Sequence, residues 1–255
     1  DKKRLLMTIF DSVTGGPSTW IRELDSGREA KINDGTNAVI SPDGESIAYR
    51  SPVEPIGLRR SSIAGTRATT ITTRNGFATD WLPDGRRLLL MSPEPGRQFD
   101  VSLLDLDTKA ITPLIHTAAG EGGARVSPDG KWVAFVSDES KRAEVYAFPL
   151  AEPENRTVIS AGGGFDPLWS DDGKELYYVT LDGMLSRVAV TIAGNHLSAG
   201  PPRALFQLRE AGGDAFFGGR YALRDRRFLI ARPTGDASSM IGVVVNWPKA
   251  LTPTP

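Results

Sequence analysis

Short apolar runs of strand length recur along the whole chain, separated by polar segments rich in Gly, Pro, Asp and Ser. Four of these runs are Ile47-Ala48-Tyr49, Leu88 to Met91, Trp132 to Val136 and Leu176 to Val179. A near-continuous apolar run of four to eight residues is typical of a strand that is covered on both faces. The pattern therefore predicts an all-β protein in which sheets pack against one another.

An Asp-Gly dipeptide precedes each of these four runs. The dipeptides are Asp43-Gly44, Asp84-Gly85, Asp129-Gly130 and Asp172-Gly173, and Asp225-Arg226 is an altered fifth copy. Asp-Gly between two apolar runs indicates a hairpin with a two-residue primed turn, because Gly adopts positive φ without steric cost and Asp tolerates it. Each dipeptide is therefore expected to join two neighbouring strands.

The spacing of the aspartates is regular, with intervals of 41, 45, 43 and 53 residues. A period in the low forties with four short strands in each repeat is typical of a β-propeller blade. The chain is therefore expected to be an all-β propeller of about six four-stranded blades. With a to d naming the strands from the axis outwards, the first blade lacks strand a and the last lacks strand d.

The repeat extends over nearly the whole chain, so a single propeller domain is predicted over residues 1–247. Its blade units are 1–34, 35–76, 77–122, 123–164, 165–208 and 209–247, with 22 strands in all and an insertion at 195–202. Residues 248–255, rich in Pro and Thr, are expected to be a disordered tail. Because the two incomplete blades lack different strands, exposed sheet edges are also expected.

Composition and charge exclude several classes of function. Lys and Arg number 30 against 31 Asp and Glu, and no basic block is present, so a nucleic-acid partner is not expected. The absence of cysteine rules out disulfides and Cys-ligated metals, and no apolar run in this segment is long enough to span a membrane.

No motif for catalysis or cofactor binding stands out. The chain has no Gly-x-Ser-x-Gly nucleophile elbow, no kinase motif and no calcium loop, and its two histidines are His116 and His196. Gly120 to Arg125 lacks the final Gly of a phosphate loop and precedes a strand. We therefore expect no enzyme activity, no cofactor and no metal site in this segment, although a catalytic triad assembled in space is not excluded by spacing.

The repeat resembles the propeller repeats of known families. Val126 to Val136 and Trp169 to Val179 are similar to the Ser-Pro-Asp-Gly-Lys repeats of the periplasmic TolB family. Residues 165–170, 200–202 and 242–247 are more similar to the C-terminal propeller of bacterial membrane-anchored serine/threonine kinases. The resemblance implies a non-catalytic interaction or sensor module in a periplasmic or other extracytoplasmic location. Prolyl-oligopeptidase-like peptidases share the repeat, so the propeller of a peptidase whose catalytic domain is absent is the alternative.

A binding site is expected at the end of the blades opposite the Asp-Gly turns. The variable segments gather there, at residues 52–57, 93–98, 117–123, 138–142, 161–164, 208–219 and 233–240. Loops on a rigid scaffold commonly carry binding residues. We therefore predict a protein or peptide ligand at this end, with four polar residues near the entrances of inner strands as tentative binding residues: Asp80, Arg125, Asp166 and Arg220.

Overall fold

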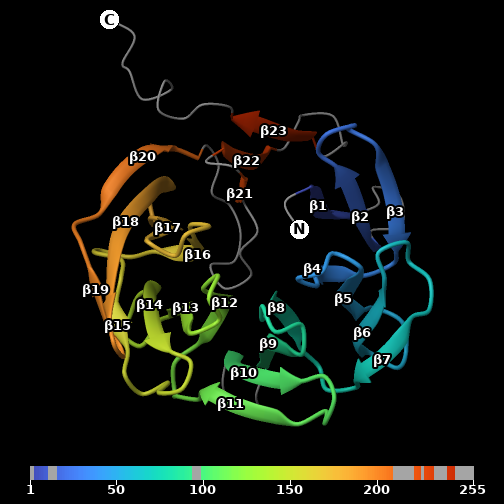
Figure 1. Ribbon diagram of the computed structural model, residues 1–255, viewed down its shortest axis with the longest axis horizontal. Helices are drawn as coiled ribbons and strands as arrows, with labels where there is room; N and C mark the ends of the chain where they lie inside the picture. Colours follow the sequence, from blue (N-terminus) through green and yellow to red (C-terminus); the bar gives the residue numbers. More distant parts are fainter. Residues whose placement is uncertain are drawn as a thin grey trace, which may run out of the picture. The chain divides into compact units, whose positions relative to one another are not determined.

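The computed structural model describes residues 3–10, 16–93, 99–208, 221–224, 227–232 and 240–244. Over these residues the regular structure is entirely β, with 23 strands in six separate antiparallel sheets. Consecutive strands lie side by side in each sheet, as in propeller blades (Figure 1). The predicted all-β propeller fold is confirmed, and over the described residues the first and last sheets have three strands each. The predicted tail, residues 248–255, lies outside the described residues.

The chain divides into two compact units, Asp1–Ala118 and Ala119–Pro255. The first unit holds three sheets. Their strands are β1 (Arg4–Phe10), β2 (Pro17–Glu23) and β3 (Glu29–Asn33); β4 (Thr36–Ile40), β5 (Ser46–Ser51), β6 (Gly57–Ser62) and β7 (Thr69–Thr72); and β8 (Phe77–Trp81), β9 (Arg87–Pro93), β10 (Phe99–Asp105) and β11 (Ile111–Ile115).

The second unit also holds three sheets. Their strands are β12 (Glu121–Val126), β13 (Trp132–Ser137), β14 (Glu144–Pro149) and β15 (Thr157–Val158); β16 (Phe165–Trp169), β17 (Glu175–Val179), β18 (Met184–Ala193), β19 (His196–Ala199) and β20 (Arg203–Gln207); and β21 (Tyr221–Arg224), β22 (Arg227–Arg232) and β23 (Met240–Val244). We call the first strand of each sheet that has four or five strands the inner strand, and we call these sheets complete. The turn end of a sheet is the end at which the turn joins its first strand to its second. The connection end is the opposite end, from which the chain passes to the next sheet.

The prediction of 22 strands is wrong by one strand in the described part of the chain. Residues 195–202, predicted as an insertion, contain β19, which pairs with the far end of β18 through a tight turn at Gly194. Gly194 has φ of 60°, which glycine adopts readily. β18 is long enough, at ten residues, to pair with both β19 and β20, so this sheet has five strands.

The Asp-Gly turns are wider than the predicted two-residue primed turns. In the first, Ser41 N–H donates to Ser46 O at 2.9 Å, and Gly44 N–H donates to Ser41 O at 2.8 Å. Pro42 and Asp43 therefore occupy the central positions of a β-turn inside a four-residue loop, and only the glycine has positive φ, 76°. Proline fits here because its fixed φ suits the first central position.

Side chains inside the turns supply further hydrogen bonds. In the turn of residues 127–132, the Ser127 hydroxyl donates to the Asp129 carboxylate at 2.5 Å and accepts the Trp132 N–H at 2.9 Å. The turns that start at Ser41 and Ser170 repeat this arrangement. Where Leu82 replaces the serine, Asp84 Oδ1 accepts from both Arg86 N–H and Arg87 N–H. Side-chain oxygens thus accept from backbone N–H groups in all four turns.

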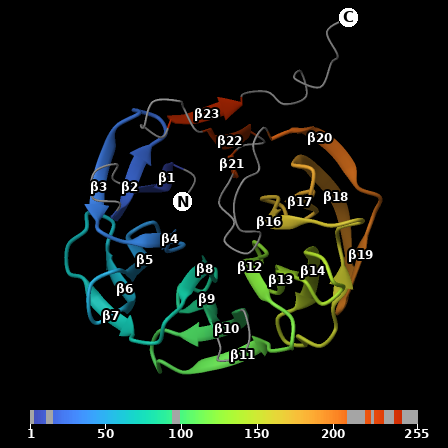
Figure 2. The ribbon, with the colours of Figure 1, turned by 180° about the vertical axis from the view of Figure 1, so that it is seen from behind.

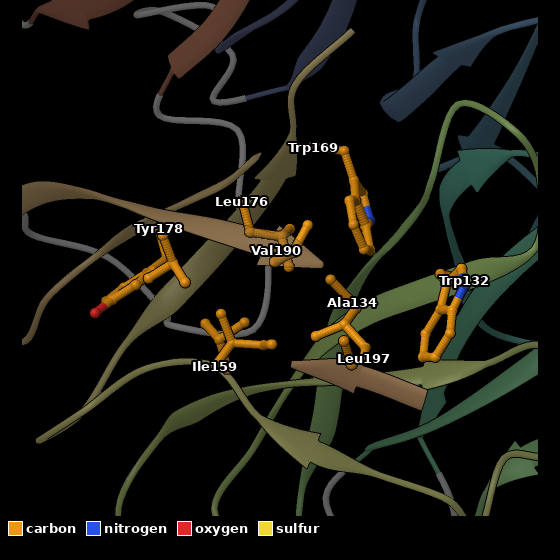
Figure 3. Close-up of a cluster of buried hydrophobic side chains, with 11 residues drawn as sticks. Trp132, Ala134, Ile159, Trp169, Leu176, Tyr178, Val190 and Leu197 are labelled. Carbon is orange, nitrogen blue, oxygen red and sulfur yellow. The ribbon is translucent and has the colours of Figure 1, made fainter. Parts of the chain in front are cut away.

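Side chains of adjacent sheets form the core within each unit. In the second unit, Trp169 of β16 packs with Trp132 and Ala134 of β13 and with Leu176, and Leu197 of β19 joins the same cluster (Figure 3). In the first unit, Trp81 of β8 packs with Ala48 and Leu58. Trp81 and Trp169 each pack against the neighbouring sheet of their own unit, as expected for apolar strands covered on both faces.

Glycine at the turns should matter for its backbone conformation. Gly85 has φ of 70°, and a Cβ added there would meet nothing within 4 Å. We expect Gly85→Ala to lower the free energy of unfolding by about 1–2 kcal/mol, with a smaller loss for Gly85→Asn because Asn tolerates this conformation. Urea unfolding measures both. Equal stability of the alanine variant and the wild type would contradict a strained turn.

The turn carboxylates should make stability depend on pH. The Ser170 hydroxyl, followed by Lys174 N–H, lowers the pKa of Asp172 below its usual value. Its contribution is therefore complete above about pH 4 and is lost as pH falls through the lowered native pKa. We expect the destabilisation by Ser170→Ala to be larger at about pH 7 than at about pH 3. If the loss of stability in Ser170→Ala is the same at both pH values, its cause is only the lost hydrogen bond from Glu175 N–H to the Ser170 hydroxyl.

Candidate functional site

The inner strands β4, β8, β12 and β16 share a bulge at the same place. In each, one extra residue of the inner strand is inserted opposite the second strand: between Thr36 and Val39, between Ala78 and Asp80, between Gly122 and Arg125, and between Phe165 and Leu168. Bulges bend a strand and redirect its side chains. The bulge lies toward the connection end of each sheet, where the binding site is predicted.

Three of these bulges contain a residue with positive φ, all in the same position along the strand. These residues are Asn37 (50°), Gly123 (59°) and Asp166 (56°). Asn, Gly and Asp are the residue types that adopt this conformation most readily. The sequence therefore provides a residue type suited to the bulge. For Asp166, predicted as a binding residue, this means that its residue type is also suited to the positive φ of the bulge.

The structure places two of the predicted binding residues in one column of the repeat. Asp80 follows the bulge of β8 and pairs with Leu89, and Arg125 follows the bulge of β12 and pairs with Ala134. Both side chains are half-buried, and the Asp80 carboxylate accepts a hydrogen bond from Trp81 N–H at 2.9 Å. Asp80 belongs to the first unit and Arg125 to the second.

Asp166 is buried rather than exposed. Its backbone oxygen accepts a hydrogen bond from the Tyr221 hydroxyl of β21 at 2.9 Å. Burial raises the pKa of Tyr221 well above its usual value; the negative charge of Asp166 adds to this and the positive charge of Arg125 opposes it. The second unit thus brings Arg125, Asp166 and Tyr221 together from three sheets. Arg220, the fourth predicted residue, lies outside the described residues.

Buried carboxylates also anchor the connection ends of two sheets, and the sequence analysis did not identify them. Asp100, near the start of β10, is buried and hydrogen bonds through Oδ2 to Nδ1 of His116, just after β11. Glu144, at the start of β14, is buried in the same way; its Oε2 accepts from the Ser160 hydroxyl and from Gly163 N–H at 2.9 Å. In both sheets an acid on the third strand holds the segment that leads to the next sheet.

A signal for this arrangement exists in the sequence but is weak on its own. Asp100 is the second residue and Glu144 the first residue of the third strand in their repeats, and both are acidic near the start of a largely buried strand. Their partners lie 16 residues further on in both repeats, at His116 and Ser160. Only the folded sheet shows that these residues meet across two strands.

The prediction that elaborated segments occur only at the connection end is wrong. The hairpin of β18 and β19 extends beyond its sheet at the turn end, where it contacts the segment between β14 and β15. Asn155 Nδ2 donates to Asn195 O at 3.2 Å, and Asn195 Nδ2 donates to Glu152 Oε1 at 2.5 Å. Because Leu197 is buried with Trp132 and Ile159, this hairpin joins two sheets of the second unit.

The described residues were also searched for metal sites and membrane spans. Over the ranges given above, no group of three or more His, Cys, Asp or Glu side chains is arranged to hold a metal ion. No helix in the same residues is long and apolar enough to cross a membrane.

The Asp100–His116 pair should contribute to stability, because His116→Ala leaves a buried carboxylate without this hydrogen bond. We expect a loss of about 1–3 kcal/mol, part of which returns in His116→Ala with Asp100→Asn, since a neutral amide is less costly to bury. Ser92→Ala is the matched control: Ser92 is buried opposite Asp100, and its hydroxyl has no hydrogen-bond partner among the described residues. Urea unfolding of the three variants provides the measurement, and an equal loss in His116→Ala and Ser92→Ala would contradict the anchor.

No protein-family model matches the chain. It is 27% identical over 176 residues to the uncharacterized protein Atu1656 of Agrobacterium fabrum. The aligned region covers 67% of this chain and 58% of that protein. It is also 28% identical over 103 residues to the uncharacterized peptidase YuxL of Bacillus subtilis. Here the aligned region covers 38% of this chain and 16% of that protein. The chain thus spans less than two thirds of either relative.

Solved structures with similar folds include two TolB proteins. TolB from Acinetobacter baumannii has a TM-score of 0.66 at 17% identity, over 95% of this chain and 64% of that chain. A protein from Agrobacterium tumefaciens provisionally designated TolB has a TM-score of 0.64 at 20% identity, over 80% of this chain and 78% of that chain. The periplasmic gluconolactonase of Pseudomonas aeruginosa, PpgL, has a TM-score of 0.55 at 15% identity, over 93% and 81%. The fold is therefore a TolB-like β-propeller, and it occurs in both enzymes and other proteins.

Proposed function

We propose that this propeller is a non-catalytic module that binds a protein or peptide at the connection ends of its sheets. The observation that carries the proposal is one position of the repeat that is charged in two sheets, as Asp80 in the first unit and as Arg125 in the second. Both residues follow the bulge of an inner strand, and both are half-buried. A carboxylate and a guanidinium are suited to the polar groups and charged termini of a peptide.

The anchored segments support binding at this end. The hydrogen bonds of Asp100 to His116 and of Glu144 to Ser160 and Gly163 fix the chain where it leaves each of two sheets. A fixed segment loses little conformational entropy when a ligand binds, so contacts made there translate more fully into affinity. The first anchor belongs to the first unit and the second to the second unit.

The proposal includes a larger parent protein in an extracytoplasmic location. The similarity to TolB structures supports this setting, and the chain spans 58% of its relative Atu1656. A parent related to membrane-anchored serine/threonine kinases is a finer form of the same proposal, based on the resemblance of residues 165–170, 200–202 and 242–247.

The second candidate rests on one observation. The match to the peptidase YuxL covers 16% of that protein, so a propeller that accompanies a peptidase domain is the alternative. The two candidates differ in what the full coding sequence should contain. Kinase motifs and a membrane span favour the first, whereas an adjoining α/β-hydrolase domain favours the second.

The test compares two double variants, each of which replaces one acidic and one basic residue by alanine. One variant is altered toward the connection end of the sheets and the other at the turn end. Asp80→Ala with Arg125→Ala changes the charged position after the bulge in one sheet of each unit. Glu45→Ala with Lys131→Ala removes two exposed side chains just after turn glycines, at the opposite end. We expect peptides selected from a displayed library on the wild type to bind the second variant normally and the first at least about tenfold more weakly, as loss of charged hydrogen bonds predicts.

Circular dichroism and urea unfolding would show that both variants are folded. Equal binding by both variants would place the site elsewhere. Reproducible hydrolysis of the selected peptides, or of a sugar lactone, by the wild-type chain would contradict the non-catalytic part of the proposal.

A further inference from the structure

A short segment, residues 73–76, carries the chain from β7 of one sheet to β8 of the next within the first unit (Figures 1 and 2). It contains Asn75-Gly76, the only Asn-Gly dipeptide of the sequence. In such a dipeptide the backbone nitrogen of glycine can attack the side-chain amide carbon of asparagine, because a residue without Cβ leaves the approach open. The segment therefore places a reactive amide next to its nucleophile.

The side chain of Asn75 is exposed, and a cation lies at its carbonyl oxygen. Nη2 of Arg50, on β5, donates to Asn75 Oδ1 at 3.3 Å, and the same guanidinium carbon lies 5.3 Å from the centre of the Phe77 ring. A cation at a carbonyl oxygen stabilises the negative charge that develops there when the carbon is attacked. Arg50 is therefore placed to favour attack on the Asn75 amide.

The nucleophile is also accessible. Over the described residues, the Gly76 N–H donates no hydrogen bond, and Gly76 lies just before Phe77, the first paired residue of β8. Asn155 provides a comparison, because it is equally exposed but is followed by Arg156, whose N–H donates to Glu154 O at 3.1 Å. The two asparagines thus differ in the residue that would attack them.

The Asp-Gly dipeptides of the turns are protected from the same reaction. A carboxylate is a far poorer electrophile than an amide. A serine hydroxyl, followed by a backbone N–H, lowers the pKa of Asp43 and of Asp172, so both carboxyls are ionised at neutral pH. Their Oδ1 atoms also accept from the N–H of Glu45 at 3.0 Å and of Lys174 at 3.1 Å, beyond the glycine. Among these dipeptides the structure favours reaction at Asn75.

We propose that Asn75 is a site of spontaneous modification, at which the chain, assisted by Arg50, converts its own asparagine to aspartate and isoaspartate. The Gly76 nitrogen gives its proton to water and bonds to Cγ of Asn75, and the side-chain nitrogen takes up a proton and leaves as ammonia. Water then opens the cyclic imide. Cleavage of the bond to Cγ gives aspartate, and cleavage of the bond to the backbone carbon gives isoaspartate. Water is the only co-reactant.

Either product changes the connection between the two sheets. Both products place a negative charge beside Arg50, so a hydrogen bond to a neutral amide becomes an ion pair. Isoaspartate also lengthens the main chain by one carbon just before β8, the strand that carries Asp80. The modification alters the connection end of this sheet, and it does not depend on whether a ligand binds there.

The test follows the peptides that contain Asn75 and Asn155 by mass spectrometry while the full chain is incubated in mildly alkaline buffer. We expect the Asn75 peptide to gain one mass unit at least about tenfold faster than the Asn155 peptide, because glycine offers no Cβ to hinder attack. The products should separate into aspartate and isoaspartate forms, and an unincubated sample gives the starting value.

Variants of two arginines test the role of the cation. Arg50→Gln should slow the reaction at Asn75 by about threefold or more, whereas Arg50→Lys, which keeps a positive charge, should retain most of the rate. Arg59→Gln is the matched control: Arg59 lies on the neighbouring strand and donates to Glu54 O at 3.5 Å, so its loss should leave the rate unchanged. Circular dichroism shows whether the variants are folded.

Two results would overturn the proposal. The first is an Asn75 peptide that keeps its mass, or that changes no faster than the Asn155 peptide. The second is an equal rate in the wild type, Arg50→Gln and Arg59→Gln, which would remove Arg50 from the reaction.

Discussion

The fold depends on the burial of the second strand in each complete sheet. Strands such as β13 and β17 carry almost continuous apolar sequences, so they are stable only when both faces are covered and both edges are paired. The inner strand satisfies one edge, and a tight reversal must deliver the chain from one strand to the next. The Ser-Pro-Asp-Gly turn does this while its hydroxyl and carboxylate satisfy the backbone groups that the reversal would otherwise leave without partners.

The same requirement shapes the opposite end of the sheets. Segments that leave one sheet for the next cannot continue a ladder of backbone hydrogen bonds, so other groups must hold them. Asp100 and Glu144 take this role, each from the third strand of its sheet. A buried carboxylate is costly unless it is hydrogen bonded. This cost fixes the position of the connecting segment, because few other positions would supply the carboxylate with hydrogen-bond donors. The result is a fixed frame next to the bulged inner strands.

The bulges connect this frame to the candidate site. A bulge needs a residue that tolerates positive φ, and Asn37, Gly123 and Asp166 provide one in three repeats. The residues after the bulge differ from sheet to sheet, from Val39 and Leu168 to Asp80 and Arg125. The repeat thus keeps the backbone constant and varies the side chains, as expected where binding specificity is placed on a rigid scaffold.

The sequence alone determined the propeller fold, because periodic Asp-Gly dipeptides and buried apolar runs are local signals that every repeat carries. It also led to the prediction of Asp80 and Arg125 as binding residues. Tertiary structure decided what depends on contacts between distant residues. The β18–β19 hairpin is stable because Leu197 packs with Trp132, a residue 65 positions earlier. The hydrogen bonds of buried Asp100 to His116 and of buried Glu144 to Ser160 likewise join residues that no local pattern relates. The same holds for the hydrogen bond from Tyr221 to Asp166. Their burial and hydrogen bonds exist only after the sheets have formed.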